Sequence, residues 1–400
     1  MNDEEKYIQQ RRRKAYHLAK RFRFMNTLPI QNNKIVFSTF EGDGGFCCNP
    51  RYIAEALHKT GKKYEMIWLL HDIDKEFPDY ITPVKDTPWN IAYHLATAKV
   101  WIDNYRKPLG THKRKGQLYI QTWHASMGFK AVGAFRGKLF PKIARIVSEA
   151  DSSLIDYVLS NSDYCTSIYP KKLFYSGPVL QFGSPRCDCL IKDKLKLREA
   201  LRLKYNLPLE EKIVLYAPTF RGGSQKGKKQ VTFDGVSLDI DGVLETLATR
   251  KNGHWTMALR LHPQLAAKMK EIPGINDNEN IIDLSQEDDM SQVLGAADLL
   301  ITDYSSCAFD ALFAQIPVIL YADDIEEYKQ NRGAFMWQRK ELPFLIAENN
   351  AQLKQCISDY DVATYENKRT NFMLAHNVVE NGDAAMKVAN VVEQWMKNGG

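Results

Sequence analysis

The stretch Asp298-Leu-Leu-Ile-Thr-Asp-Tyr-Ser-Ser-Cys-Ala-Phe-Asp310 contains the pattern that decides the fold. An apolar run of the kind that forms a buried parallel strand ends at Thr302 and Asp303, and a helical pattern begins beyond Ser305 and Ser306. Free N–H groups and the positive end of the helix dipole favour an anion such as phosphate at this junction, and two hydroxyls can add hydrogen bonds. The alternative is that one of the serines only caps the helix.

Strands of this kind recur along the chain in two series that alternate with helical stretches. The first series comprises residues 34–40, 64–70, 99–103, 117–122, 156–160 and 179–182, and the second comprises 212–217, 255–261, 280–284, 298–302 and 317–321. Two successive series of strand and helix predict an α/β protein with two doubly wound, Rossmann-like parallel sheets that face a cleft.

The predicted boundaries divide the chain into five parts. They are a basic helix at 1–30, an N-terminal domain at 31–188, a linker helix at 189–210, a C-terminal domain at 211–375 and a final helix at 376–400.

Composition excludes several classes of protein. The chain has 400 residues, of which 44% are hydrophobic and 26% are charged, as in globular proteins. The seven cysteines follow no CxxC spacing and we expect no secretory leader, so a disulfide scaffold and a zinc ribbon are both disfavoured. Apolar runs are far shorter than the roughly 20 residues of a membrane span.

The net charge of +6 lies mostly at the N-terminus. Eight of the first 25 residues are Lys or Arg, and three are Asp or Glu. Leu18, Phe22 and Met25 recur at helical spacing, which predicts a basic helix with an apolar edge. This edge either enters an anionic membrane surface or packs on the protein. No later segment repeats such a basic cluster, so we expect no binding of nucleic acid.

Polar residues also follow other predicted strands. The strand at 117–122 runs into His124, and an imidazole, whose pKa in water is about 6.5, suits proton abstraction at neutral pH. A lone histidine can instead be structural. The glycines at 42–45 lack the third glycine of a dinucleotide fingerprint, which disfavours a classical NAD enzyme and a P-loop NTPase.

Two further strand ends carry cations. Arg260 and His262 lie at the carboxyl end of the predicted strand at 255–261, where their side chains can contact a ligand. Arg260 can instead form a structural salt bridge. The segment 217–221 ends in Arg221, which is a weak signal by itself.

Together these motifs resemble the CDP-glycerol glycerophosphotransferase family of teichoic acid and capsule synthesis. The resemblance spans about residues 117–336 and rests on QTWH at 121–124, GSPRCD at 183–188, LYAPTFR at 215–221, RLHP at 260–263 and LITDYSSCAFD at 300–310. It implies the GT-B architecture, with the donor nucleotide in the C-terminal domain. The sequence departs from the usual family pattern at Ala125-Ser126, where Gly-Thr is usual, and at Cys187, where Asn is usual.

The resemblance also implies a reaction and its participants. Glycerol phosphate would pass from CDP-glycerol, or ribitol phosphate from CDP-ribitol, to a hydroxyl of a lipid-linked polyprenyl or polyol-phosphate acceptor, and CMP would leave. No cofactor and no metal ligands are expected, and a metal requirement stays open. We expect the enzyme in the bacterial cytoplasm, peripheral on the inner face of the cell membrane.

The resemblance assigns roles to residues of this chain. His124 would be the general base, and His262 would also be catalytic. The expected donor-binding residues are Arg221, Arg260, His262, Thr302, Asp303, Ser305, Ser306 and Asp310, and the expected acceptor-binding residues are Asn49, Arg51, Ser126 and Lys130. The alternatives are a GT-B glycosyltransferase that uses a nucleotide sugar and a non-catalytic module that binds membranes through its basic N-terminus.

Overall fold

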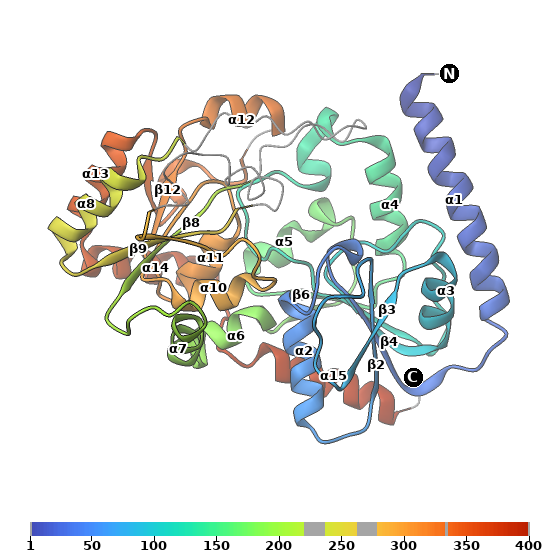
Figure 1. The fold of residues 1–400 in the computed structure, drawn as a ribbon. Coiled ribbons are helices and arrows are strands. Elements are labelled where there is room, and N and C mark those ends of the chain that lie inside the picture. The colour runs from blue at the N-terminus through green and yellow to red at the C-terminus, as the bar shows by residue number, and fades with distance from the viewer. Residues whose placement is uncertain (1, 220–236, 262–277, 333–334, 399–400) are drawn as a thin grey trace. The chain divides into compact units, whose positions relative to one another are not determined.

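The computed structural model describes residues 2–219, 237–261, 278–332 and 335–398. The chain divides into two compact units (Figure 1). The first unit holds residues 1–126, 131–188 and 377–400, and the second holds 127–130 and 189–376.

The first unit contains a parallel sheet with helices around it. Its strands are β1 (Gln31–Ser38), β2 (Glu65–Leu70), β3 (Ile81–Lys85), β4 (Ala98–Asp103), β5 (Leu118–Gln121), β6 (Tyr157–Ser160) and β7 (Val179–Gln181). Its helices are α1 (Asp3–Met25), α2 (Cys48–Lys59), α3 (Pro88–Thr97), α4 (Lys142–Ser152), α5 (Asp163–Lys172) and α15 (Ala384–Lys397), with short 3-10 segments η1 (Phe40–Gly42) and η2 (Gly133–Leu139). Helix α6 (Pro185–Lys192) begins in this unit and ends in the second.

The second unit repeats the plan. Its strands are β8 (Lys212–Ala217), β9 (Trp255–Leu259), β10 (Ile281–Asp283), β11 (Leu299–Thr302), β12 (Val318–Tyr321) and β13 (Leu345–Ala347). Its helices are α7 (Lys194–Lys204), α8 (Ile240–Lys251), α10 (Met290–Ala296), α11 (Cys307–Phe313), α12 (Ile325–Arg332), α13 (Asn350–Asp359) and α14 (Val362–Ala375), with the 3-10 segment η3 (Arg339–Glu341).

Both sheets are parallel and doubly wound. The strand order is β3-β2-β1-β4-β5-β6-β7 in the first unit and β10-β9-β8-β11-β12-β13 in the second. The order therefore reverses between β1 and β4 and again between β8 and β11. Doubly wound sheets bind their ligands outside the carboxyl ends of the strands at such a switch point. We therefore expect ligand-binding residues directly after β4, β8 and β11, and after β5, which lies beside β4.

Each sheet has its own apolar core. Strand β4 is buried along its whole length, as expected for a central parallel strand with both faces covered. The core beneath β4 and β5 includes Trp101 and Tyr119, while the core of the second unit gathers around Met257, Leu259 and Ile301. The rigid strands therefore position the residues that follow them.

Helix α1 packs on α3 and belongs to the first unit (Figure 1). A capping box starts it, because Asn2 Oδ1 accepts from the Glu5 N–H at 2.8 Å and Glu5 Oε2 accepts from the Asn2 N–H at 3.0 Å.

The apolar edge of α1 packs on the protein. Leu18 and Phe22 are buried in a cluster with residues of α3 and β4, and Met25 packs against the same cluster. Of the two expectations for this edge, packing on the protein is confirmed and insertion into a membrane is wrong. The cations remain outside, because Arg12, Arg13 and other Lys and Arg side chains of α1 are exposed.

The observed units differ from the predicted parts: the predicted separate helix at 1–30 belongs to the first unit, residues 127–130 belong to the second, and the remaining differences concern α7 and α15. Helix α7 lies in the predicted linker, yet it packs against α10 within the second unit. Helix α15, predicted as a separate final part, packs against α2, where Lys62 Nζ and Tyr64 OH reach Glu393. Both helices therefore belong to the cores of their units.

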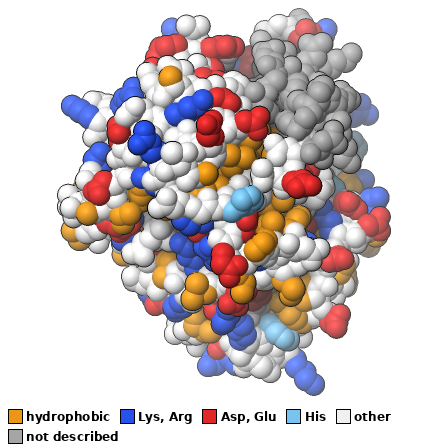
Figure 2. Space-filling model, turned by 60° about the vertical axis from the view of Figure 1, so that its left-hand side comes forward, with side chains coloured by type: hydrophobic (Ala, Val, Ile, Leu, Met, Phe, Trp, Pro, Cys, Tyr) orange, Lys and Arg blue, Asp and Glu red, His pale blue; other side chains and the backbone are white. Residues whose placement is uncertain are grey.

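Among the described residues, no helix combines the length and the apolar character needed to cross a bilayer. On the face drawn in Figure 2, Lys and Arg side chains are intermixed with Asp and Glu.

Two phenylalanines of α1 offer a matched test of its docking. Phe22 is 0% exposed and Phe24 is 65% exposed. We expect Phe22→Ala to lower the free energy of unfolding of the first unit by about 3–5 kcal/mol and Phe24→Ala to lower it by no more than about 1 kcal/mol. Hydrogen exchange of the β4 amides in urea reports the first unit separately. Equal losses in the two variants would contradict the observed packing.

Candidate active site

His124 follows β5 at the carboxyl end of the first sheet. Between them Trp123 has φ 52°, in the left-handed region that residues other than glycine rarely adopt. Hydrogen bonds hold this residue on both sides: its N–H donates to Gln121 Oε1 at 2.9 Å, and its carbonyl accepts from Asn49 Nδ2 at 2.9 Å. The surroundings thus maintain a strained conformation next to His124, as is common at functional sites.

The ring of His124 has a defined tautomer. Its Nδ1 lies 2.8 Å from the carbonyl oxygen of Asn104, the first residue after β4. A carbonyl oxygen can only accept, so Nδ1 carries the hydrogen and Nε2 of the neutral ring has the free lone pair. Nε2 is therefore the atom that can accept a proton.

Aromatic rings surround His124. The ring centroids of Phe40, Tyr105 and Trp123 lie 5.5, 5.7 and 4.6 Å from that of His124, and the rings of Tyr105 and Trp123 are stacked with it. The histidine nevertheless stays partly exposed. The surroundings restrict its orientation while leaving it accessible.

Burial and nearby cations disfavour protonation of His124. Burial is the main cause that lowers the pKa of His124 from 6.5 to about 4, and Lys172, Arg186 and Arg106 lower this pKa further, while the hydrogen bond to Asn104 opposes them. The imidazole is therefore neutral and able to accept a proton at pH 7. An anionic substrate beside these cations would raise the pKa toward neutrality.

Sequence reasoning did not identify these three cations. Buried Lys172 donates from Nζ to the carbonyls of Ala125 and Ser126, both at 3.1 Å. The guanidinium of Arg106 lies 4.9 Å from the ring centroid of Trp123. Only Arg186 carried a sequence signal, because it lies in the GSPRCD motif.

The four predicted acceptor residues have different surroundings. Asn49 is buried and supports the backbone: besides Trp123, its Oδ1 accepts from the Arg186 N–H at 3.0 Å. Ser126 is buried, and Arg51 Nε lies 2.8 Å from Glu55 Oε1. Lys130 belongs to the second unit, where its Nζ lies 5.7 Å from the ring centroid of Tyr328. The structure thus groups Asn49 and Ser126 with His124 in one unit and places Lys130 in the other.

Thr302 and Asp303 join two strand ends at the switch point of the second sheet. Thr302 Oγ1 donates to the carbonyl of Ala217 at 2.6 Å. Asp303 Oδ1 accepts from the N–H and from Oγ1 of Thr219 at 2.8 and 2.6 Å. Thr302 therefore contacts the last residue of β8, and Asp303 contacts the segment after it.

Ser305 and Ser306 occupy the turn between β11 and α11. Both are partly exposed, and Ser306, the N-cap residue, makes no side-chain capping hydrogen bond. Of the alternative that Ser305 or Ser306 only caps the helix, the part that concerns Ser306 is therefore wrong, and the part that concerns Ser305 stays a prediction. Asp310 is buried in α11. Arg260, after β9, donates from Nη1 to the Ser285 carbonyl at 3.0 Å.

Two predicted site residues, Arg221 and His262, lie outside the described residues. Within the described part of the chain, no group of three or more His, Cys, Asp or Glu side chains is arranged to hold a metal ion.

Two doubly wound parallel sheets, each with polar side chains beyond its switch point, define a GT-B-like protein. A sequence profile of the CDP-Glycerol:Poly(glycerophosphate) glycerophosphotransferase family matches residues 20–394. The chain belongs to this family.

Curated relatives share most of the chain. A teichoic acid poly(glycerol phosphate) polymerase of Bacillus spizizenii is 30% identical over 92% of this chain and 93% of its own length. A teichoic acid glycerol-phosphate transferase of Staphylococcus aureus is 27% identical over 93% and 95%. The chain spans about half of a longer polymerase, 51% of that of Staphylococcus epidermidis.

Solved structures of the wall teichoic acid polymerase TagF have the same fold. One TagF structure superposes with a TM-score of 0.80 at 25% identity, covering 100% of this chain and 99% of that one. A TagF variant with CDPG superposes with a TM-score of 0.81 at 26% identity, covering 98% of both chains.

The lowered pKa of His124 can be measured directly. In the protein without substrate, we expect the imidazole to become protonated only as the pH falls through about 4. NMR of histidine labelled with ¹⁵N, assigned with His124→Gln, follows this titration. A midpoint near 6.5 would show that burial and the cations do not act on the ring as inferred.

Proposed function

We propose that the chain transfers glycerol phosphate from CDP-glycerol to a hydroxyl group of a teichoic acid acceptor and releases CMP. Family membership supports the reaction. The observation that links this reaction to a particular residue is the geometry of His124 in the QTWH motif. Its Nδ1 is hydrogen-bonded to a carbonyl oxygen, which leaves Nε2 as the base.

The proposed reaction is one displacement at phosphorus. The acceptor oxygen attacks the phosphorus nearest the glycerol of CDP-glycerol while Nε2 of His124 takes the hydroxyl proton. A new P–O bond to the acceptor forms, and the P–O bond to CMP breaks with its electron pair on the departing CMP.

The second unit supplies the donor site in this proposal. The hydroxyls of Ser305 and Ser306 donate to the pyrophosphate, and Asp310 approaches the ribose. Thr302 and Asp303 hold the turn in place through the end of β8 and the segment after it. Arg221, Arg260 and His262 would hold the charge that develops on the pyrophosphate, a role that rests on their motifs.

The test is CMP release from CDP-glycerol in the presence of a synthetic acceptor. A general base contributes about 10²- to 10⁴-fold to a rate, so His124→Gln should lower kcat by that factor. Donor affinity, measured by calorimetry, should stay unchanged. His112→Gln, at an exposed histidine of the same unit, is the control. Near-normal kcat in His124→Gln would remove the base from the proposal.

A second candidate donor is CDP-ribitol. A teichoic acid ribitol-phosphate primase of Bacillus spizizenii is 26% identical over 93% of this chain and 94% of its own length. The same site chemistry would serve a longer alditol, so the donor is decided by assay.

The donor site predicts a change in affinity. Replacing Ser305 or Ser306 by Ala should weaken CDP-glycerol binding by about 1.5–3 kcal/mol each, because a hydrogen bond to a charged phosphate is lost. Ser358→Ala in α13 is a matched control in the same unit, since its hydroxyl donates to the Lys354 carbonyl within its own helix. Unchanged calorimetric affinity in both site variants would assign the two serines to structure.

We further propose that the acceptor is lipid-linked and that the enzyme binds the inner face of the bacterial membrane. The support is the row of exposed cations on α1, whose apolar edge is already used inside the protein. Contact with anionic lipid would therefore be mainly electrostatic, at about 1 kcal/mol per cation near the surface.

Charge removal tests this contact. Replacing Arg12, Arg13 and Lys14 together by Gln should weaken sedimentation with anionic liposomes, and salt should do the same. The control variant replaces three exposed lysines elsewhere in the first unit, Lys59, Lys63 and Lys115, and so removes the same charge. Equal liposome binding by the two triple variants would move the membrane contact away from α1.

A further inference from the structure

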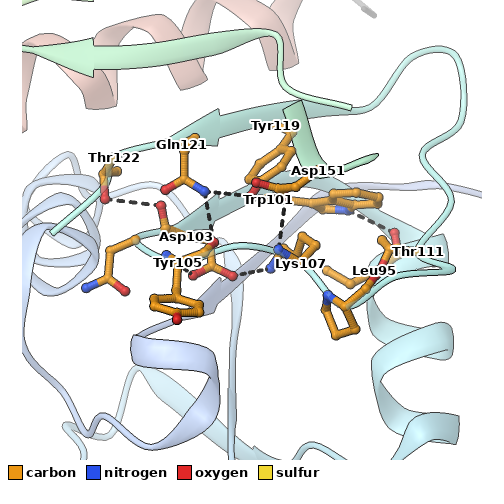
Figure 3. Close-up of polar contacts among 12 residues, drawn as sticks. Leu95, Trp101, Asp103, Tyr105, Lys107, Thr111, Tyr119, Gln121, Thr122 and Asp151 are labelled. Atoms are coloured by element: carbon orange, nitrogen blue, oxygen red, sulfur yellow. Dashed lines mark hydrogen bonds and ion pairs between the residues drawn. The ribbon is translucent and has the colours of Figure 1, made fainter. Parts of the chain in front are cut away.

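A buried polar network lies under the turn that contacts His124 (Figure 3). The turn comprises residues 103–107 and begins at the last residue of β4. It will be called the 103–107 turn. Its second residue, Asn104, provides the carbonyl that accepts from His124 Nδ1.

A buried ion pair joins the first and last residues of the 103–107 turn. Asp103 Oδ2 and Lys107 Nζ are 2.6 Å apart, and both side chains are less than 5% exposed. The other carboxylate oxygen of Asp103 accepts from the Tyr105 N–H at 2.9 Å. One buried carboxylate therefore binds both the middle and the end of the 103–107 turn.

A chain of hydrogen bonds connects the turn to β5 and α4. Asp151 Oδ1 in α4 accepts from the Lys107 N–H at 2.9 Å and from Tyr119 OH at 3.1 Å. Gln121 Nε2 donates to Tyr119 OH at 2.9 Å and to the Tyr105 carbonyl at 2.8 Å. In Figure 3 the side chains of Tyr119, Gln121 and Asp151 lie close to one another.

The same network supports the residues just before His124. The Asp103 carbonyl accepts from the N–H of Thr122 at 2.8 Å and from its Oγ1 at 3.1 Å. Gln121 Oε1 accepts from the Trp123 N–H. The network thus holds both the residues that carry the imidazole and the carbonyl that binds it.

We propose that this network is a positioning device for His124: it fixes the 103–107 turn so that the Asn104 carbonyl keeps the hydrogen on Nδ1 and leaves Nε2 as the base. Lys107, Asp103 and Asp151 are positioning residues in this sense, because they act through Asn104. The predicted effect of these residues on kcat rests on the proposed function, whereas their predicted effect on the tautomer of His124 does not.

The energetics favour positioning over simple stabilisation. Burial raises the pKa of Asp103, and it raises the pKa of Asp151 to about 7, so keeping charge here costs free energy. Buried ion pairs stabilise proteins little compared with apolar residues of similar volume. Their directional bonds do fix one backbone geometry, and misplacing a catalytic group by about 1 Å can cost about 10²-fold in rate.

The first test is Lys107→Met in the full chain. It removes the ammonium group and leaves a side chain of similar length. With CDP-glycerol and a synthetic acceptor, kcat should fall by about ten- to a hundredfold, while CDP-glycerol affinity by calorimetry stays within about twofold of that of the unaltered chain, because the proposed donor site lies in the other unit.

Lys34→Met is the matched control. Lys34 is also a buried lysine of the first unit, bonded to Thr97 and Glu65, but it lies in the amino-terminal half of β1, before the carboxyl end of the sheet. Its loss should lower stability without lowering kcat at temperatures where both variants are folded. Tyr119→Phe is a milder second variant that deletes the hydroxyl between Gln121 and Asp151, and it decides the question if Lys107→Met does not fold.

The tautomer of His124 distinguishes positioning from a purely structural role. If the network only stabilised the fold, substitutions in it would leave the tautomer unchanged. In ¹⁵N NMR, the unaltered chain and Lys34→Met should show hydrogen on Nδ1, and Lys107→Met and Tyr119→Phe should show a share of the Nε2–H form. Unchanged tautomer and kcat in the two folded network variants would overturn the inference and leave the proposed function intact. If the unaltered chain releases no CMP, the proposed function fails, and the tautomer still decides the positioning role.

Discussion

The hydrogen bond from His124 Nδ1 to the Asn104 carbonyl is the contact on which the candidate site depends. It joins the segment after β5 to the residue after β4, and these two strands are neighbours in the first sheet. Because a carbonyl cannot donate, this one contact selects the tautomer and the basic nitrogen of the ring. The parallel sheet makes the contact possible, since it brings the carboxyl ends of neighbouring strands to the same edge.

A buried aspartate stands at the same topological place in both units. Asp103 ends β4, and Asp303 follows β11; each strand lies directly across the switch point from the first strand of its sheet. Each carboxylate accepts a backbone N–H from its own turn, from Tyr105 in one unit and Tyr304 in the other. Such carboxylates cost free energy to bury, and they order the turns that a ligand would meet.

Much of this arrangement could be predicted from the sequence, and the rest depends on contacts between distant residues. The strand before His124 was recognisable from its apolar run. Strand β3 was not, because Pro83 interrupts an exposed edge strand. An amphipathic pattern indicates that Phe22 is buried but does not say against what. The sequence places Asp303 at the end of an apolar strand, and the structure has it directly after β11. Its bonds to the segment after β8, like the contact of Asn104 with His124, arise only on folding.

The measurement that tests the account most directly is mass spectrometry of a synthetic lipid acceptor incubated with the enzyme and either CDP-glycerol or CDP-ribitol. We expect CDP-glycerol to extend the acceptor by glycerol phosphate, with one CMP released for each unit added, and the parallel reaction decides whether CDP-ribitol is also a donor. An acceptor that stays unextended with CDP-glycerol, or that is extended only with CDP-ribitol, would contradict the account.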